Sequence, residues 1–191
     1  MANKPVISIV AKSGTGKTTL LEKLIGELKR RGYRVGVMKH DAHQFDIDRE
    51  GKDSWRLTQA GAHTMVISSP AKIAIIKQNA NMMEPSVSDV VNTYYSDVDI
   101  VLTEGFKKNH FPKIEVHRKE RSSTIMCRGE THDPTLIAVA SDDHLEVDVP
   151  VFDINDFRGI CDLIEMQFLS VSVRKPRVLE MSRSVPENYS S

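Results

Sequence analysis

One short segment near the beginning of the chain has the residue types of a phosphate-binding loop. Residues 11–18 read AKSGTGKT, which fits the pattern G-x-x-x-x-G-K-[ST] except that alanine occupies the first glycine position. Gly14 and Gly16 let backbone N–H groups converge on phosphate oxygens at the positive end of the following helix. Lys17 would neutralise the β- and γ-phosphates, and the Thr18 hydroxyl would hold magnesium. The residues that we expect to contact the nucleotide are Lys12, Ser13, Gly14, Thr15, Gly16, Lys17, Thr18 and Thr19.

A carboxylate suited to the same metal ion follows a second apolar run. In VDIVLTEGF (residues 98–106), Glu104 comes at the end of the run and Gly105 permits a turn close to the γ-phosphate. A phosphate loop normally works with such a carboxylate at the end of a neighbouring strand, where it fixes the magnesium shell. We therefore expect Thr18 and Glu104 to surround Mg²⁺. The alternative is a strand-end glutamate that only faces water.

A polar segment follows the second strand of the chain, at residues 39–54. A cluster at the carboxyl end of a strand lies on the edge where open α/β sheets bind ligands. We expect a nucleotide-responsive or partner-facing loop. A transition-metal site is the alternative, although the spacing of the histidines fits no zinc pattern. The residues of this candidate loop are Lys39, His40, His43, Asp46, Asp48, Lys52 and Asp53.

Two further residues bear on which nucleotide binds and how. Lys12 occupies the first position of K-x-G-x-G-K-T, where a deviant group of phosphate loops uses a lysine to reach the nucleotide of a partner subunit; the alternative is a solvated surface lysine. Asp142 follows the apolar run LIAVAS (136–141). Its carboxylate could accept hydrogen bonds from guanine N1 and N2, or it could simply begin a turn.

The elements that must position these residues alternate between strands and helices. Alternation of this kind predicts an α/β fold: three layers, similar to P-loop NTPases, with a mainly parallel sheet and helices on both faces. Residues 64–68 and 72–77 bracket Ser69-Pro70 and predict a hairpin. The other predicted strands are 6–10, 33–40, 98–106, 113–118 and 136–141, and the predicted helices are 18–32, 54–60, a segment after Pro85, and 157–169.

Composition narrows the class of protein. Over 191 residues, 26 Lys and Arg balance 26 Asp and Glu, so no global field favours nucleic acid or an anionic membrane. Two separated cysteines suit reduced, buried thiols, and no long apolar run predicts a membrane span or a signal peptide. We expect a cytoplasmic protein with one nucleotide-binding domain at 1–169 and a mobile tail at 170–191, where serines and prolines replace helical periodicity.

Together, the blocks AKSGTGKTTLL, KHDAHQFDIDREGKDS with AGA (60–62), LTEGFKK and IAVASD resemble the MobB family of molybdopterin-guanine dinucleotide biosynthesis adaptor proteins. The four blocks occur in the family's order and cover roughly residues 5–169. The resemblance implies a GTP-binding accessory protein with at most slow GTPase activity, usually a homodimer. It would assist the guanylyltransferase MobA in attaching GMP to molybdopterin. The family's nucleotide loop falls on residues 14–18, and its Walker B carboxylate falls on Glu104.

A small-molecule kinase that uses ATP is the alternative function. Such an enzyme needs an arginine-rich lid to enclose the phosphates, and HRKERSSTIMCRGE (117–130) contains three arginines. A solvated connecting segment is the interpretation that we favour for it, since nothing in the sequence obviously places an arginine beside the phosphate loop. A nucleic-acid-binding domain is disfavoured because the net charge is zero and basic and aromatic residues do not interleave.

Overall fold

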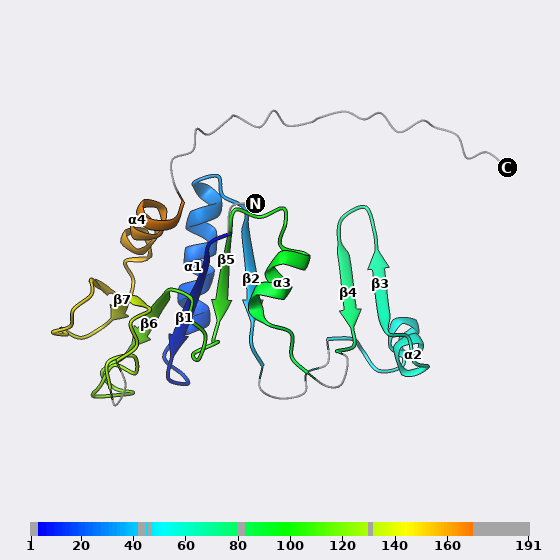
Figure 1. Cartoon of the computed structure of the whole chain (residues 1–191), viewed down its shortest axis with the longest axis horizontal. Coiled ribbons are helices and arrows are strands. Elements are labelled where there is room, and N and C mark those ends of the chain that lie inside the picture. Colours follow the sequence, from blue (N-terminus) through cyan, green and yellow to red (C-terminus); the bar gives the residue numbers. More distant parts are fainter. Residues whose placement is uncertain (1–3, 42–44, 46, 80–82, 130–131, 170–191) are drawn as a thin grey trace.

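A six-stranded parallel sheet forms the centre of the molecule (Figure 1). The computed structural model describes residues 4–41, 45, 47–79, 83–129 and 132–169. The strand order is β2-β5-β1-β6-β7-β8, and every neighbouring pair is parallel. The strands are β1 (Val6–Ala11), β2 (Val35–Lys39), β5 (Ile100–Glu104), β6 (Lys113–His117), β7 (Leu136–Ser141) and β8 (Val151–Asp153). The predicted α/β class with a mainly parallel sheet is confirmed.

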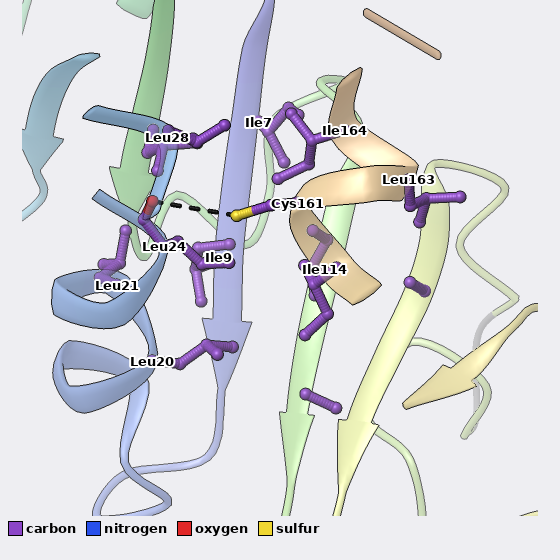
Figure 2. Packing of buried hydrophobic residues seen from close by; sticks show 14 of the residues in the cluster. Ile7, Ile9, Leu20, Leu21, Leu24, Leu28, Ile114, Cys161, Leu163 and Ile164 are labelled. Atoms are coloured by element: carbon purple, nitrogen blue, oxygen red, sulfur yellow. Dashed lines mark hydrogen bonds between the residues drawn. The ribbon is translucent and has the colours of Figure 1, made fainter. Parts of the chain in front are cut away.

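Helices cover both faces of this sheet, because alternate strand residues point to opposite sides and both sides are apolar. On one face, α1 (Lys17–Arg30) and α4 (Phe157–Phe168) enclose a core that includes Ile7, Ile9 and Ile114. Figure 2 shows leucines of α1 and residues of α4 meeting over these isoleucines. On the other face, α3 (Val87–Tyr94) packs Val87 and Val91 against Val6 and Val101. The three-layer prediction is therefore confirmed.

An ion-pair network joins the C-terminal end of α1 to the middle of α4, the two helices that share a face. The Arg31 guanidinium, 13% exposed, follows α1 and pairs with Glu27 at 2.7 Å, with Asp162 at 2.6 Å and with Glu165. Hydrogen bonds from Arg30 and Arg31 lower the pKa of Glu27 to about 2. The network fixes α1, which begins at the phosphate loop, against α4.

Close backbone approach explains a glycine in β2. A Cβ added at Gly36 would lie 2.4 Å from Cδ1 and 2.7 Å from Cε1 of Tyr95. Tyr95 follows α3, and its hydroxyl donates to the Val37 carbonyl at 2.6 Å. The tyrosine ring can therefore lie against the strand only because no side chain is present at Gly36.

A second, smaller unit stands apart from the central sheet (Figure 1). It consists of α2 (Asp53–Gln59) and the antiparallel hairpin of β3 (Thr64–Ser68) and β4 (Ile73–Lys77). The predicted hairpin is confirmed, but α2 buries none of its residues. Several apolar side chains of this unit are exposed; they are Leu57, Val66, Ile67, Ile73 and Ile75.

The structure differs from the sequence-based expectations at short or terminal features. Strand β8 was not expected, because three residues carry too little pattern to identify a strand. The predicted tail at 170–191 lies outside the described residues.

Cys127 and Cys161 are buried free thiols, as expected. Among the described residues, no helix combines the length and apolar character that crossing a membrane requires.

Candidate functional site

The phosphate loop connects a fully buried strand to the start of α1. Every residue of β1 is buried, so the strand fixes where the loop begins. Gly14 and Gly16 have positive φ angles of 75° and 95°, a backbone region that residues with side chains rarely adopt. The Thr15 hydroxyl donates to the Lys12 carbonyl at 2.9 Å and closes the loop. The chain therefore presents the N-terminus of a 14-residue helix behind a tight turn, which suits an anion.

Three lysines gather at this edge of the sheet. Partial burial lowers the pKa of Lys17, the positive charge of Lys107 lowers it further, and Glu104 acts in the opposite direction. Lys39 adds a smaller repulsive effect on the same ammonium group. A bound polyphosphate would relieve this repulsion, because its oxygens accept charge-assisted hydrogen bonds from such groups. Lys107 was not among our predicted site residues, although it lies in the LTEGFKK block.

Thr18 and Glu104 lie together, as the proposed metal site requires. The Thr18 hydroxyl donates to Glu104 Oε1 at 3.0 Å across a separation of 86 positions in sequence. Strand register explains the meeting: Glu104 pairs with Ile9 of β1 on one side and with Lys39 of β2 on the other. A hydroxyl and a carboxylate are hard oxygen ligands of the kind that Mg²⁺ prefers. The residues present therefore fit this ion.

The turn after β5 is strained at the same place. Gly105 has a φ of 93°, and Phe106 has a φ of 55°, which costs a non-glycine residue free energy and often marks functional positions. The Gly105 N–H donates to the Ile9 carbonyl at 3.0 Å, and the His40 ring lies 5.0 Å from the Phe106 ring. This turn joins the ends of β1, β2 and β5.

Two arginines lie against the phosphate loop, contrary to our sequence-based expectation. Arg118 Nε donates to the Thr15 carbonyl at 3.1 Å. A Cβ added at Gly14 would meet Arg121 Cζ at 3.8 Å. Both residues follow β6, and β6 is the neighbour of β1 in the sheet. The segment that we favoured as a solvated connection is thus placed beside the loop by strand order, which the sequence pattern does not reveal.

Lys12 turns toward this same segment. Its ammonium group donates to the Ser122 hydroxyl at 2.5 Å. A contact with the nucleotide of a partner subunit would require this side chain to leave Ser122, and it stays a prediction. Ser13 and Thr19 are exposed at the loop and the first turn of α1.

Asp142 lies at the carboxyl end of β7, in the lining of an open recess of about 360 Å³ between β7 and β8. The Asp142 carboxylate accepts from the Lys119 N–H at 3.0 Å and from Arg118 Nη1 at 3.2 Å. The Lys119 backbone bond and then the nearby Arg118 charge lower the pKa of Asp142. Guanine recognition by Asp142 stays a prediction, and it would require these bonds to be exchanged.

Comparison with known proteins identifies the family. Residues 6–142 match the family described as MobB, molybdopterin guanine dinucleotide synthesis protein B. The chain belongs to the MobB family. It is 39% identical over 163 residues to the molybdopterin-guanine dinucleotide biosynthesis adapter protein of Haemophilus influenzae, which covers 84% of this chain and 88% of the relative. The corresponding adapter protein of Escherichia coli is 38% identical over 164 residues, covering 84% and 91%.

A solved MobB structure supports the same assignment. A crystal structure of molybdopterin-guanine biosynthesis protein B (mobB) is similar with a TM-score of 0.69 and 29% identity, covering 86% of this chain and 99% of that one. The resemblance inferred from the four sequence blocks is confirmed.

In this MobB-family chain, the described residues of the polar segment 39–54 lie in two separate places. Lys39 and His40 stay at the phosphate site, where the His40 N–H donates to the Glu104 carbonyl at 3.1 Å. Lys52 and Asp53 begin α2 and lie with the smaller unit, away from the central sheet (Figure 1). Asp48 accepts from the Ser54 hydroxyl at 3.0 Å and so belongs to the start of α2.

The transition-metal alternative for this segment gains no support from the described part of the chain. His43 and Asp46 of this segment lie outside the described residues. Elsewhere in the described ranges, no group of three or more histidine, cysteine, aspartate or glutamate side chains is arranged to hold a metal ion.

Proposed function

We propose that this protein is a GTP-binding accessory protein of molybdopterin-guanine dinucleotide biosynthesis. It would bind GTP with Mg²⁺, hydrolyse it slowly, and assist the guanylyltransferase MobA in attaching GMP to molybdopterin. The observation that carries the proposal is the Thr18–Glu104 contact of 3.0 Å beside the phosphate loop, in a chain of a family named for this synthesis. The two relatives above are themselves named adapter proteins.

The chemistry of the site favours holding a nucleotide over rapid turnover. Phosphoryl transfer depends on positioned charge and an oriented acceptor. Lys17, Lys39 and Lys107 supply positive charge around the phosphates. The carboxylate of Glu104, which lies beside these lysines, already accepts a hydrogen bond from the Thr18 hydroxyl. We therefore assign binding and magnesium coordination to these residues, with slow hydrolysis as their consequence.

Calorimetric titration with GTP and with ATP, each with and without Mg²⁺, tests this proposal. We expect tighter binding of GTP, strengthened by Mg²⁺, and loss of binding in Lys17→Ala with an unchanged melting temperature, because Lys17 is a ligand group outside the core. Unaltered GTP affinity in Lys17→Ala would contradict the site assignment. A measured stimulation of MobA by the unmodified protein, absent in Lys17→Ala, would support the adaptor role.

A kinase that uses ATP is the second candidate, and one observation favours keeping it. Arg118 and Arg121 lie at the phosphate loop, as an arginine-bearing lid requires. Preference for ATP in the titration, followed by phosphate transfer to a small acceptor, would place the kinase first.

We further propose that the protein is a homodimer and that a second copy covers the hairpin unit. Val66, Ile73 and Ile75 share one face of the hairpin, with exposed fractions of 51%, 66% and 46%. Ile67 is exposed on the opposite face, so both faces of the hairpin offer apolar surface to a partner. Light scattering should give the mass of two chains, and Ile73→Asp should give one. A complex with MobA alone would instead assign this face to MobA.

A further inference from the structure

The turn at residues 118–122 is attached to the phosphate loop at two points. Arg118 Nε donates to the Thr15 carbonyl at 3.1 Å across 103 positions of sequence. The Lys12 ammonium donates to the Ser122 hydroxyl at 2.5 Å. Because Lys12 and Thr15 lie on either side of Gly14, the turn spans the glycine that forms the middle of the loop.

Buried hydrogen bonds hold this turn from behind. The His117 side chain, 3% exposed, lies with Nε2 at 3.0 Å from the Ser122 carbonyl and Nδ1 at 3.0 Å from the Ser141 hydroxyl. A carbonyl only accepts, so Nε2 carries the proton. The Arg121 and Ser122 N–H groups donate to the Arg118 carbonyl at 3.0 Å and 3.1 Å. The turn is therefore built into β6 and β7.

Arg121 projects from this fixed turn over the phosphate loop. Its guanidinium carbon lies 3.8 Å from the position of a Cβ on Gly14. The Arg121 side chain is 54% exposed and forms an ion pair with Glu120 at 3.5 Å. An exposed pair of this kind contributes little free energy, so a more highly charged anion at the loop competes for the guanidinium effectively.

We propose that Arg121 contacts the phosphate groups of the bound nucleotide, and that Arg118 is the residue that positions it. A guanidinium offers a planar set of donors that matches two phosphate oxygens, whereas an ammonium acts as a point charge. The inference rests on the proposed function, since it requires a nucleoside triphosphate in the loop. It adds to Lys17, Lys39 and Lys107 a guanidinium group that comes from the segment after β6.

Calorimetric titration with GTP and Mg²⁺ compares the unmodified protein with Arg121→Ala, Arg121→Lys and Lys29→Ala. We expect Arg121→Ala to weaken GTP binding by about tenfold, which corresponds to about 1.4 kcal/mol. Arg121→Lys should lie between this variant and the unmodified protein, because it keeps the charge without the planar donors. Lys29→Ala is the matched control: it removes one positive charge about 18 Å along α1 from Lys17, and it should bind GTP as the unmodified protein does.

Equal melting temperatures would show that the exposed substitution leaves the fold intact. If Arg121→Ala binds GTP within twofold of the unmodified protein, the inference is overturned while the proposed function stands. If Lys29→Ala loses as much affinity as Arg121→Ala, the effect is general electrostatics and the inference is equally overturned. Failure of the unmodified protein to bind GTP would remove both the inference and the proposed function.

Discussion

Glu104 interacts with two residues at the start of α1. It accepts the Thr18 hydroxyl at 3.0 Å, and it lies close enough to Lys17 to favour that residue's charged form. A carboxylate next to a polyphosphate is unfavourable unless a cation lies between them. We therefore expect Glu104 to make nucleotide binding depend on Mg²⁺.

The substitution Glu104→Gln should distinguish the effect of Glu104 on Mg²⁺ from its effect on the nucleotide. The amide keeps the shape of the side chain but removes its charge. We expect GTP affinity without Mg²⁺ to stay the same or rise, and the gain on adding Mg²⁺ to fall to less than twofold. Calorimetry in EDTA and in Mg²⁺ measures both quantities. A full Mg²⁺ effect in the variant would show that another group holds the ion.

The sequence predicts some of these residues because their meaning is local. The spacing within AKSGTGKT and the position of Glu104 after an apolar run identify the two halves of the site without knowledge of the fold. Arg118 and Arg121 could not be predicted in the same way. Their place beside the phosphate loop depends on β6 lying next to β1, a pairing between segments about 100 residues apart that has no signature in the local pattern.

At the scale of elements, a contact with the end of α3 holds β2 in place. Tyr95 lies against Gly36 and bonds the Val37 carbonyl, so α3 holds the strand that leads to Lys39 and His40. Sequence periodicity predicts both β2 and α3 but not the contact between them. From the sequence alone, a glycine within a strand indicates only that the strand is weakened there. Strand β8 was missed for the related reason that an edge strand of three residues carries little pattern.

Gly36→Ala should destabilise the protein by about 1–3 kcal/mol, since the new methyl group would overlap the Tyr95 ring and force a backbone shift. Urea denaturation measures the change in the free energy of unfolding. Gly26→Ala, in α1, is the matched control, because an added Cβ there meets nothing within 4 Å. It should stabilise by about 0.5–1 kcal/mol through helix propensity. Equal effects of the two substitutions would contradict the proposed contact.

At the scale of the whole molecule, positive and negative charges balance, yet individual carboxylates form strong local ion pairs and hydrogen bonds. Hydrogen bonds lower the pKa of Glu27 to about 2, from an ordinary value of 4.5. Burial opposes ionisation of Asp133, yet bonds from Thr135 and Lys113 outweigh it and lower the pKa of Asp133 to about 2. The Lys113 side chain is only 1% exposed and pairs with Asp133 at 3.0 Å. These two carboxylates stabilise the fold in their ionised forms.

Stability should therefore fall in acid. A carboxylate whose pKa is lower in the folded chain contributes fully above its unfolded value, and that contribution is lost as the pH falls through the folded value. We expect the free energy of unfolding to decline between about pH 4.5 and pH 2, measured by urea denaturation. Glu27→Gln should start less stable and lose less over this range. A parallel decline in that variant would assign the acid sensitivity to other groups.

The strand order has a consequence for how the chain is made. Strand β1 pairs with β5 and β6, and β2 pairs with β5. Residues 1–99 thus contain the central strand β1 and the edge strand β2 without any of the strands that pair with them, and the hairpin of β3 and β4 is the sheet they can complete. During synthesis, β1 and β2 must wait for residue 100 and beyond before their backbone groups are paired. Ribosome-bound chains that pause before that point should be the ones that need protection by chaperones.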